Sequence, residues 1–259
     1  MLTDQPLAAT GLDGVALKPR EHDLALAPRL DADLLNVDYE GRDAFPDDET
    51  LVALAESHDL RVTTPVRADG FDPLGDDSRL PLAAGKRVLV AGNPAYLTES
   101  ERERPVAPRI GAARDRAPQA WLGTEGIERL AMAASGPQYE LLSRHTRREL
   151  RAVRAAGFDG ELVLYAPVVL TDDTDERLDA VGGYVSRRGP VRRALPDDAA
   201  TDSTARGRAR EVLTSAIPDF SLVGTPDAID DRISELREIG VDTVVGYPAR
   251  GLDAFLGDG

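Results

Sequence analysis

The chain has 259 residues, of which 42% are hydrophobic and 5% aromatic, and it contains no cysteine. A chain of this length can bury a large, mainly aliphatic core, and the lack of cysteine excludes a disulfide framework, a thiolate nucleophile and a thiolate metal site. Acidic residues outnumber basic residues by 46 to 31, and the resulting formal net charge of −15 argues against a nucleic-acid partner.

The basic residues are almost all arginine, because Lys18 and Lys86 are the only lysines. An excess of carboxylates with so few lysines is typical of cytoplasmic proteins from salt-accumulating organisms, since at molar salt the Debye length is about 3 Å and like charges repel weakly. No run approaches the roughly 18 apolar residues of a membrane span, and the first residues lack a signal-peptide pattern. We therefore expect a halophilic, cytoplasmic protein without a membrane partner.

Short apolar runs recur along the chain and do not alternate strictly with polar residues, as is typical of buried strands in a parallel sheet. Eight runs fit this description: Gly14–Leu17, Leu34–Val37, Leu60–Thr63, Arg87–Ala91, Gln119–Leu122, Glu161–Ala166, Phe220–Val223 and Thr243–Gly246. Helical patterns separate several of them. Eight strands alternating with helices over about 250 residues indicate a (β/α)8 barrel. We predict a single α/β domain of TIM type over residues 1–259.

The helical patterns carry recognisable ends. An acidic first turn at 47–49 precedes an apolar stripe, and near the C-terminus Thr225 is placed to cap a helix that Pro226 opens and Gly240 ends. Residues 127–134, 139–156 and 178–185 also show helical stripes, the second with an arginine-rich outer face that we expect to pair with carboxylates. Residues 65–85 and 93–118 show no such stripe and are predicted to be abbreviated crossovers or rim loops, and 189–207 a surface loop.

A glycine-containing stretch follows the fifth run. The apolar segment breaks at Gly123, and a helical pattern resumes after Gly126. Glycines between a buried strand and a helix allow backbone N–H groups to converge, and a helix N-terminus favours an anion such as phosphate. Alternatively, the two glycines only form a tight strand-to-helix turn.

In a barrel of this kind the working face is formed by the carboxyl ends of the strands. Residues that directly follow the runs are therefore candidates for the site: Lys18, Asp38, Tyr39, Glu40, Thr64, Arg67, Asn93, Gly123, Thr124, Glu125, Gly126, Tyr165, Thr225, Tyr247 and Arg250. Asp38 could serve as an acid or base, or as a structural carboxylate. Lys18 could bind phosphate or form a Schiff base, although pairing with Asp38 or Glu40 is the interpretation we favour.

The histidines and acidic residues point to no further chemistry. Only His22 follows a strand closely enough to reach the mouth of a barrel. No nucleophile-elbow sequence is present, and no spacing of histidine, aspartate or glutamate indicates a metal site.

Several segments resemble the luciferase-like flavin/deazaflavin oxidoreductases. The segments Ile217–Ile229 and Glu238–Val245 resemble the C-terminal signature of that family, and the stretch from Gln119 to Ala134 resembles the glycine loop and helix of its methylenetetrahydromethanopterin-reductase-like subgroup. Residues 158–167 and 171–175 also follow the subgroup's pattern, with weaker similarity at 64–67 and 85–92. The resemblance extends over residues 118–248, and it implies a (β/α)8 barrel.

The resemblance also implies a cofactor, coenzyme F-420 or FMN, and roles for particular residues. Gly123, Thr124, Glu125 and Gly126 would hold the cofactor's phosphate. Thr63, Thr64, Pro65 and Val66 would lie beneath its ring, and Asp38 and Tyr39 would face the reacting edge. A homodimer is expected from the same resemblance.

We therefore expect an oxidoreductase that transfers a hydride to or from a small molecule. Two alternatives stay open. This chain is shorter than most members of the family, and the carboxylate of Glu125 is unfavourable beside a phosphate, so the barrel could be degenerate and non-catalytic or regulatory. A phosphate-binding lyase or isomerase that uses Lys18 is the other.

Overall fold

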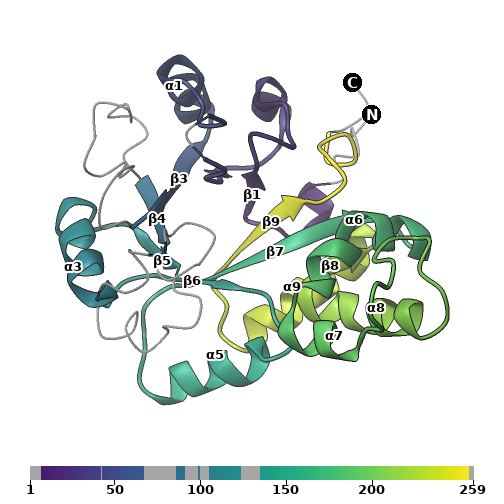
Figure 1. Ribbon diagram of the computed structural model, residues 1–259. Coiled ribbons are helices and arrows are strands. Elements are labelled where there is room, and N and C mark those ends of the chain that lie inside the picture. The colour runs from purple at the N-terminus through teal and green to yellow at the C-terminus, as the bar shows by residue number, and fades with distance from the viewer. Residues whose placement is uncertain are drawn as a thin grey trace.

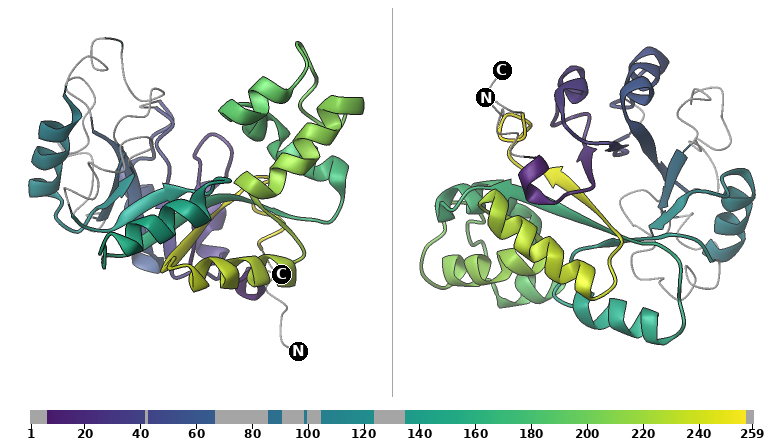
Figure 2. Two further views of the ribbon diagram at one scale, coloured as in Figure 1. Left: turned by 90° about the horizontal axis from the view of Figure 1, so that it is seen from below. Right: turned by 180° about the vertical axis from the view of Figure 1, so that it is seen from behind.

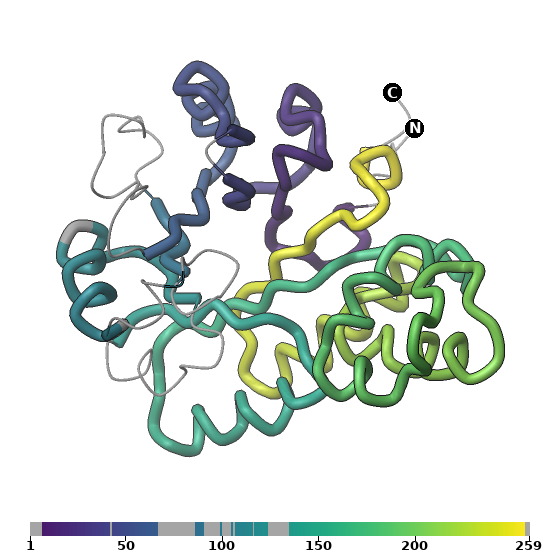
Figure 3. The backbone as a smooth tube through the Cα atoms, in the orientation of Figure 1, coloured from purple at the N-terminus to yellow at the C-terminus, as the bar shows by residue number. Residues whose placement is uncertain are grey.

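The computed structural model describes residues 7–41, 43–66, 86–90, 99, 105–123 and 135–256. Its strands and helices alternate along the chain (Figures 1 and 3). The strands are β1 (Gly14–Leu17), β2 (Leu34–Val37), β3 (Asp59–Pro65), β4 (Lys86–Val90), β5 (Trp121–Gly123), β6 (Gln138–Leu141), β7 (Leu162–Leu170), β8 (Leu222–Gly224) and β9 (Thr243–Pro248). The helices are η1 (Ala8–Thr10), η2 (Leu24–Arg29), α1 (Asp48–Ser57), α3 (Val106–Arg116), α5 (Thr146–Ala155), α6 (Thr174–Ser186), α7 (Gly189–Ala194), α8 (Gly207–Phe220) and α9 (Pro226–Glu238).

Eight of these strands form a closed parallel barrel. From β1 to β7 each strand pairs in parallel with the next, β7 pairs with β9, and β9 returns to β1. The helices α1, α3, α5 and α9 lie around the outside of the strands (Figure 1). The predicted TIM-type (β/α)8 fold is confirmed.

Two of the predicted segments were wrong. Residues 139–141, predicted as the start of a helix, belong to barrel strand β6, which pairs with β5 on one side and β7 on the other. Phe220–Val223, predicted as a barrel strand, is instead the end of α8 followed by β8. Among the described strands, β8 pairs only with the last residues of β7, at Val168–Leu170, and therefore lies outside the closed ring.

The crossovers also differ from the prediction. The connection between β4 and β5 is not abbreviated, because it contains α3, a helix of 11 residues. The predicted surface loop at 189–207 begins with α7. The crossover between β3 and β4, residues 67–85, lies outside the described residues.

The connection between β7 and β8 forms a small helical lobe from α6, α7 and α8. Its apolar side chains make a core separate from that of the barrel, centred on Leu178, Val181, Leu213 and Ile217. Figure 2 shows these three helices gathered beside the barrel. Val169 near the end of β7 belongs to the same core, so the lobe is anchored to the strand with which β8 also pairs.

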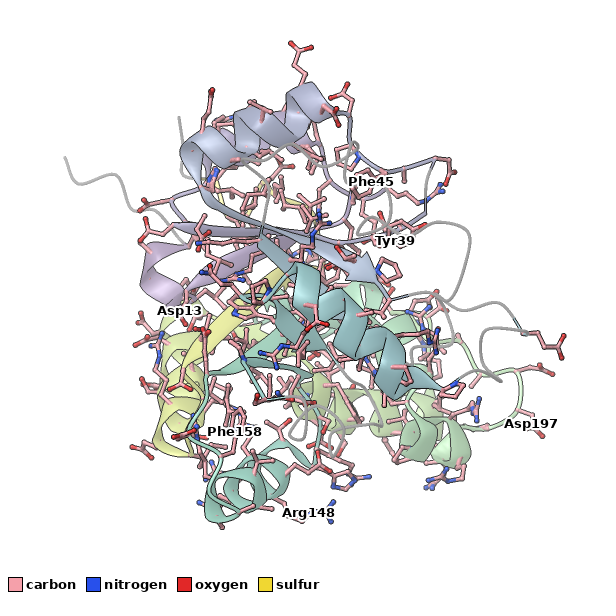
Figure 4. All side chains as sticks on the ribbon, turned by 90° about the vertical axis from the view of Figure 1, so that its left-hand side faces the viewer. Asp13, Tyr39, Phe45, Arg148, Phe158 and Asp197 are labelled. Carbon is pink, nitrogen blue, oxygen red and sulfur yellow. The ribbon has the colours of Figure 1, made fainter. Side chains whose placement is uncertain are left out.

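The arginine-rich face of α5 is paired with carboxylates, as predicted. Arg154 reaches Asp242 at 2.6 Å and Arg147 reaches Glu235 at 3.5 Å. Arg148, at the outer side of the helix (Figure 4), pairs with its neighbour Glu149 at 3.3 Å. These exposed pairs contribute little stability individually, and they fit a solvated helix face better than a binding site for a polyanion.

Candidate active site at the carboxyl-terminal mouth of the barrel

Alternation along the strands decides which side chains enter the barrel. In β2, Leu35 and Val37 pack outward in the same core as Leu51 of α1, whereas Asn36 is fully buried on the other face. The interior core contains small and β-branched residues together with four aromatic rings. The interior of the barrel is thus packed with side chains, and the residues that directly follow the strands lie at its carboxyl-terminal end.

The four interior aromatic residues form a continuous row from β5 to β9. Trp121 stacks on Tyr139 with 5.9 Å between ring centroids, and Tyr139 meets Tyr165 at 5.8 Å. Tyr165 in turn stacks on Tyr247, 6.4 Å away with the rings tilted by only 7°. Aromatic residues make up only 5% of the chain, yet four of them are gathered in the barrel interior. Their stacked rings form a rigid wall on one side of the interior.

Asp38 lies at the mouth, directly after β2, and three side chains donate hydrogen bonds to it. Its Oδ1 accepts from Asn36 Nδ2 at 2.7 Å and from the hydroxyl of Thr63 at 3.2 Å. Its Oδ2 accepts from the hydroxyl of Tyr165 at 3.0 Å. The residue is partly exposed. Groups from β2, β3 and β7 thus converge on one carboxyl.

The environment raises the pKa of Asp38 from its ordinary value to about 6. Burial is the main cause, because it disfavours the charged carboxylate. The nearby charge of Lys18 and the hydrogen bonds from Tyr165 and Thr63 act in the opposite direction, and Glu40 adds to the rise. A carboxyl that titrates near pH 6 can both accept and release a proton at neutral pH, which is the requirement for general acid–base catalysis.

Lys18 pairs with a different carboxylate from those predicted. Its ammonium lies 3.4 Å from Glu21 and 3.6 Å from the ring centroid of Tyr247. The hydroxyl of Tyr247 also donates to Glu21, while Glu40 accepts from the backbone of Arg20. The ammonium is thus held by a carboxylate and by the face of an aromatic ring, contacts that fit a structural role better than a Schiff-base nucleophile.

His22 has a structural role between two strand ends. Its Nδ1 accepts a hydrogen bond from the backbone N–H of Lys18, and its Nε2 lies 2.9 Å from the carbonyl oxygen of Pro248. This pattern assigns the proton of the neutral ring to Nε2. Burial lowers the pKa of His22, although the Pro248 carbonyl opposes the effect. Through these two hydrogen bonds the imidazole connects the segment after β1 to the end of β9.

The other predicted residues near Asp38 lie on both faces of their strands. Thr63 faces the interior, where it bonds Asp38, whereas the hydroxyl of Thr64 donates to the carbonyl of Val62. Pro65 is buried at the end of β3, and Val66 packs outward in the core that contains Leu89 of β4 and Ile110 of α3. Of the four residues from 63 to 66, Thr63 is the one that contacts Asp38.

Tyr39 is buried next to Asp38 in the chain but packs against Phe45, with 6.4 Å between the ring centroids. Figure 4 shows the two residues close together. Its ring therefore supports the segment after β2.

The glycine stretch is described only at its start. Gly123 ends β5, and a Cβ at this position would lie 3.3 Å from Tyr139 Cδ1 and 3.4 Å from Val90 Cγ2. The absence of a side chain at Gly123 thus allows the Tyr139 ring to pack closely against β5 in the barrel interior. Thr124, Glu125 and Gly126 lie outside the described residues.

Asn36 is the site residue that the sequence analysis did not identify. It is fully buried, and its Oδ1 has no hydrogen-bond partner among the described residues. The available signal was its position two residues before Asp38, which places both side chains on the same face of an extended strand.

A second polar cluster lies at the opposite end of the barrel. The guanidinium of Arg61 stacks 3.7 Å above Trp121, and its Nε and Nη1 are without partners in the described part of the chain. The indole N–H donates to Glu161, which also accepts from Thr243. Burial lowers the pKa of Arg61, and the negative charges of Asp59 and Glu161 oppose this lowering. This cluster fills the base of the barrel.

Two features are absent from the described residues. No group of three or more histidine, aspartate or glutamate side chains is arranged to hold a metal ion. Among the helices that the structure describes, none combines the length and hydropathy that crossing a membrane requires.

The fold and the mouth define a TIM-type barrel with a carboxyl of raised pKa at the carboxyl ends of its strands. Residues 7–255 match the sequence profile of a family described as "Family of unknown function (DUF7388)", and the chain belongs to that family. Among solved structures it resembles the crystal structure of apo-MsnO8, with a TM-score of 0.57, 14% sequence identity, and coverage of 94% of this chain and 95% of the other. At this identity the similarity establishes the fold alone. A comparison with curated proteins gave no match.

Proposed function

We propose that this protein is an oxidoreductase that transfers a hydride between coenzyme F-420 or FMN and a small molecule at the mouth of the barrel. In this proposal Asp38 exchanges the proton that accompanies the hydride. The observation that carries it is the carboxyl of Asp38, held by three donors from three strands, with a pKa of about 6.

The donor arrangement leaves one oxygen of Asp38 available. An ionised carboxylate has about four lone-pair sites, two on each oxygen. Both sites on Oδ1 are used by Asn36 and Thr63, whereas among the described residues Oδ2 accepts only from Tyr165. A substrate hydroxyl that approaches from the mouth could therefore donate to Oδ2.

The described residues fit the reacting end of such a cofactor by their chemistry. Removal of a hydride from an alcohol carbon also requires a base for the hydroxyl proton, and Asp38 meets that requirement. Thr63 would lie at the ring, while the proposed phosphate contacts of Gly123 to Gly126 depend on residues outside the described ones. The choice of F-420 or FMN rests on the sequence resemblance.

The chain's own residues would act through binding and proton transfer. When bound, the cofactor supplies or accepts the hydride, which is chemistry that no side chain can provide. In the direction of alcohol oxidation, the substrate O–H bond breaks and its proton moves to Asp38 Oδ2 as the carbonyl forms. In the reverse direction, Asp38 returns that proton to the new alkoxide oxygen. Tyr165 keeps Oδ2 oriented during both steps.

A second candidate uses the same carboxyl without redox chemistry. The ammonium of Lys18 and the carboxyl of Asp38 belong to the same mouth, and Lys18 is close enough to affect the pKa of Asp38. A cation beside a base suits a lyase or isomerase that binds an anionic substrate and moves a proton.

A ligand screen by thermal unfolding distinguishes the two candidates. Because an acidic, lysine-poor composition is typical of proteins from salt-accumulating organisms, the screen is done in molar salt with F-420, FMN and FAD. A ligand present at 100 times its Kd stabilises the fold by about 2.7 kcal/mol, which raises Tm by roughly 5 to 10 °C for a chain of this size. An unchanged Tm with all three compounds at millimolar concentration would exclude the oxidoreductase and favour the second candidate.

A further inference from the structure

Asn36 has a hydrogen-bonding pattern that packing alone does not explain. Its Nδ2 donates to Asp38 Oδ1 at 2.7 Å and to Thr63 Oγ1 at 3.2 Å, and Thr63 closes the triangle by donating to the same Asp38 oxygen. Its own Oδ1 is buried and lacks a partner among the described residues. An apolar side chain of similar size would fill the space without an unpaired carbonyl.

The orientation of the amide follows from its neighbour. If the amide were reversed, Asn36 Oδ1 would lie 2.7 Å from Asp38 Oδ1, and two acceptors at that distance repel when the carboxyl is ionised. The amide therefore turns its N–H groups toward Asp38 and leaves its oxygen without a donor. An unsatisfied buried acceptor is costly, and such local violations are expected where function requires them.

We propose that Asn36 is a positioning residue that anchors Asp38 Oδ1, so that proton exchange takes place at Asp38 Oδ2. This inference rests on the proposed role of Asp38 as the acid–base group. With both sites on Oδ1 occupied by the donors of Asn36 and Thr63, the site on Oδ2 that no described residue occupies is the one that can take a proton without displacing a donor. The substrate is therefore a molecule that presents an O–H or N–H donor to Oδ2, next to the hydroxyl of Tyr165.

Other groups also act on Asp38, and the test must separate Asn36 from them. The charged groups that act on Asp38 include Lys18 and Glu40, from the segments after β1 and β2. Tyr165 of β7 and Tyr247 of β9 are the titratable groups nearby, and Tyr247 is itself bonded to Glu21. The hydrogen bonds of the Asn36 amide go to Asp38 and Thr63 and to none of these groups. A change at Asn36 that leaves them in place isolates its contribution.

The experiment is a carboxyl ¹³C NMR titration of the ligand-free protein, with Asp38→Asn to assign the signal. In Asn36→Leu we expect the titration midpoint of Asp38 to rise by about 1 to 2 pH units, because a hydrogen bond that favours the charged form has been removed. Thr64→Val is the matched control, since it removes a buried hydroxyl from the adjacent position of β3 that bonds a backbone carbonyl instead. We expect the control to titrate as the wild type does.

A residue that only fills space would give the opposite pattern. Asn36→Leu would then alter the free energy of unfolding and leave the Asp38 midpoint within about 0.3 units of wild type, and that result would overturn the inference. If Asn36→Leu does not fold, the side-chain ¹⁵N–¹H signals of Asn36 are followed in the wild type. They should move with the Asp38 titration and be independent of pH in Asp38→Asn. Signals that do not respond to pH in the wild type contradict the inference.

Neither measurement requires a cofactor. The ligand screen can therefore fail while Asn36 still controls Asp38, and the reverse outcome is equally distinguishable.

Discussion

The hydroxyl of Tyr165 donates to Asp38 Oδ2 over 3.0 Å and joins β7 to the segment after β2 across the mouth of the barrel. The two residues are 127 positions apart in the chain. Burial raises the pKa of the Tyr165 phenol well above its ordinary value, and the nearby charge of Asp38 adds to the rise. Tyr165 therefore stays protonated at any physiological pH and acts as a fixed donor.

Tyr165→Phe should raise the pKa of Asp38 further, because the variant keeps the ring stacked on Tyr247 and removes only the donor. We expect an upward shift of about 1 unit, given the strength of a hydrogen bond to a charged group. The ¹³C titration of Asp38 measures it. A midpoint equal to that of the wild type would show that the hydroxyl does not stabilise the carboxylate.

Asp38→Asn should stabilise the fold at pH 8 and not at pH 4. The pKa of Asp38 is higher in the folded protein than in the unfolded chain, so between about pH 4 and pH 6 the folded state binds more protons, and stability falls as pH rises through this window. Above it the wild type carries the cost of a buried charge, which the amide avoids. We expect a gain of about 1 to 3 kcal/mol in the free energy of unfolding at pH 8.

Urea unfolding of both proteins at the two pH values provides the measurement. A pH-independent difference between wild type and Asp38→Asn would be incompatible with the raised pKa. If the proposed function is correct, the same substitution abolishes turnover, which makes this position an example of stability given up for activity.

Lys18→Met should raise the pKa of Asp38, and the effect should depend on salt. Burial is the main cause of the Asp38 shift, and the positive charge of Lys18 is the first of the groups that oppose it. Methionine keeps much of the apolar stem and removes the charge. The shift should be largest at low ionic strength and shrink toward molar salt, where the Debye length falls to about 3 Å. An effect of equal size at both salt concentrations would point to altered packing instead.

The barrel was predictable because its strands are continuous apolar runs and its helix ends carry local signals. For α9 the sequence indicated the cap, the opening proline and the ending glycine. In the structure Thr225 accepts from the backbone of Ala228, Pro226 opens the helix, and Gly240 follows with a φ of 101°. Such features depend on residues close in sequence, so they can be read without knowledge of the tertiary contacts.

Strand β6 could not be read in this way. Its sequence, Gln-Tyr-Glu-Leu, is half polar, and the spacing of Tyr139 and Leu142 also fits a helix. Pairing with β5 and β7 decides its conformation, and pairing partners are a property of the whole fold. The same holds for the site. Asp38 was identified from its position after a strand, but its contact with Thr63 depends on the register between β2 and β3, which sequence alone does not specify.

The helical lobe offers a matched pair of glycine substitutions in α6. A Cβ at Gly182 would lie 2.0 Å from the backbone carbonyl oxygen of Thr201, whereas one at Gly183 would meet only the Thr201 hydroxyl, at 3.9 Å. Gly182→Ala should therefore lower the free energy of unfolding by about 1 to 3 kcal/mol or more, because backbone must move. Gly183→Ala should raise it by about 0.5 to 1 kcal/mol through helix propensity. Equal effects of the two substitutions would mean that the Thr201 carbonyl does not approach Gly182 in α6.

Gly123→Ala tests whether this glycine serves the barrel interior or a ligand. The added Cβ would be 3.3 Å from the Tyr139 ring and 3.4 Å from Val90, so the packed interior must give by a few tenths of an ångström. We expect a loss of about 1 to 3 kcal/mol in the ligand-free protein. Gly111→Ala in α3 is the control, because a Cβ there would meet no atom of the described residues within 4 Å beyond its chain neighbours and its own helix backbone, and it should stabilise the helix by about 0.5 to 1 kcal/mol. Urea unfolding without ligand measures both. If Gly123→Ala is as stable as wild type yet loses the thermal shift with F-420 or FMN, the glycine is needed for the ligand and the packing explanation is wrong.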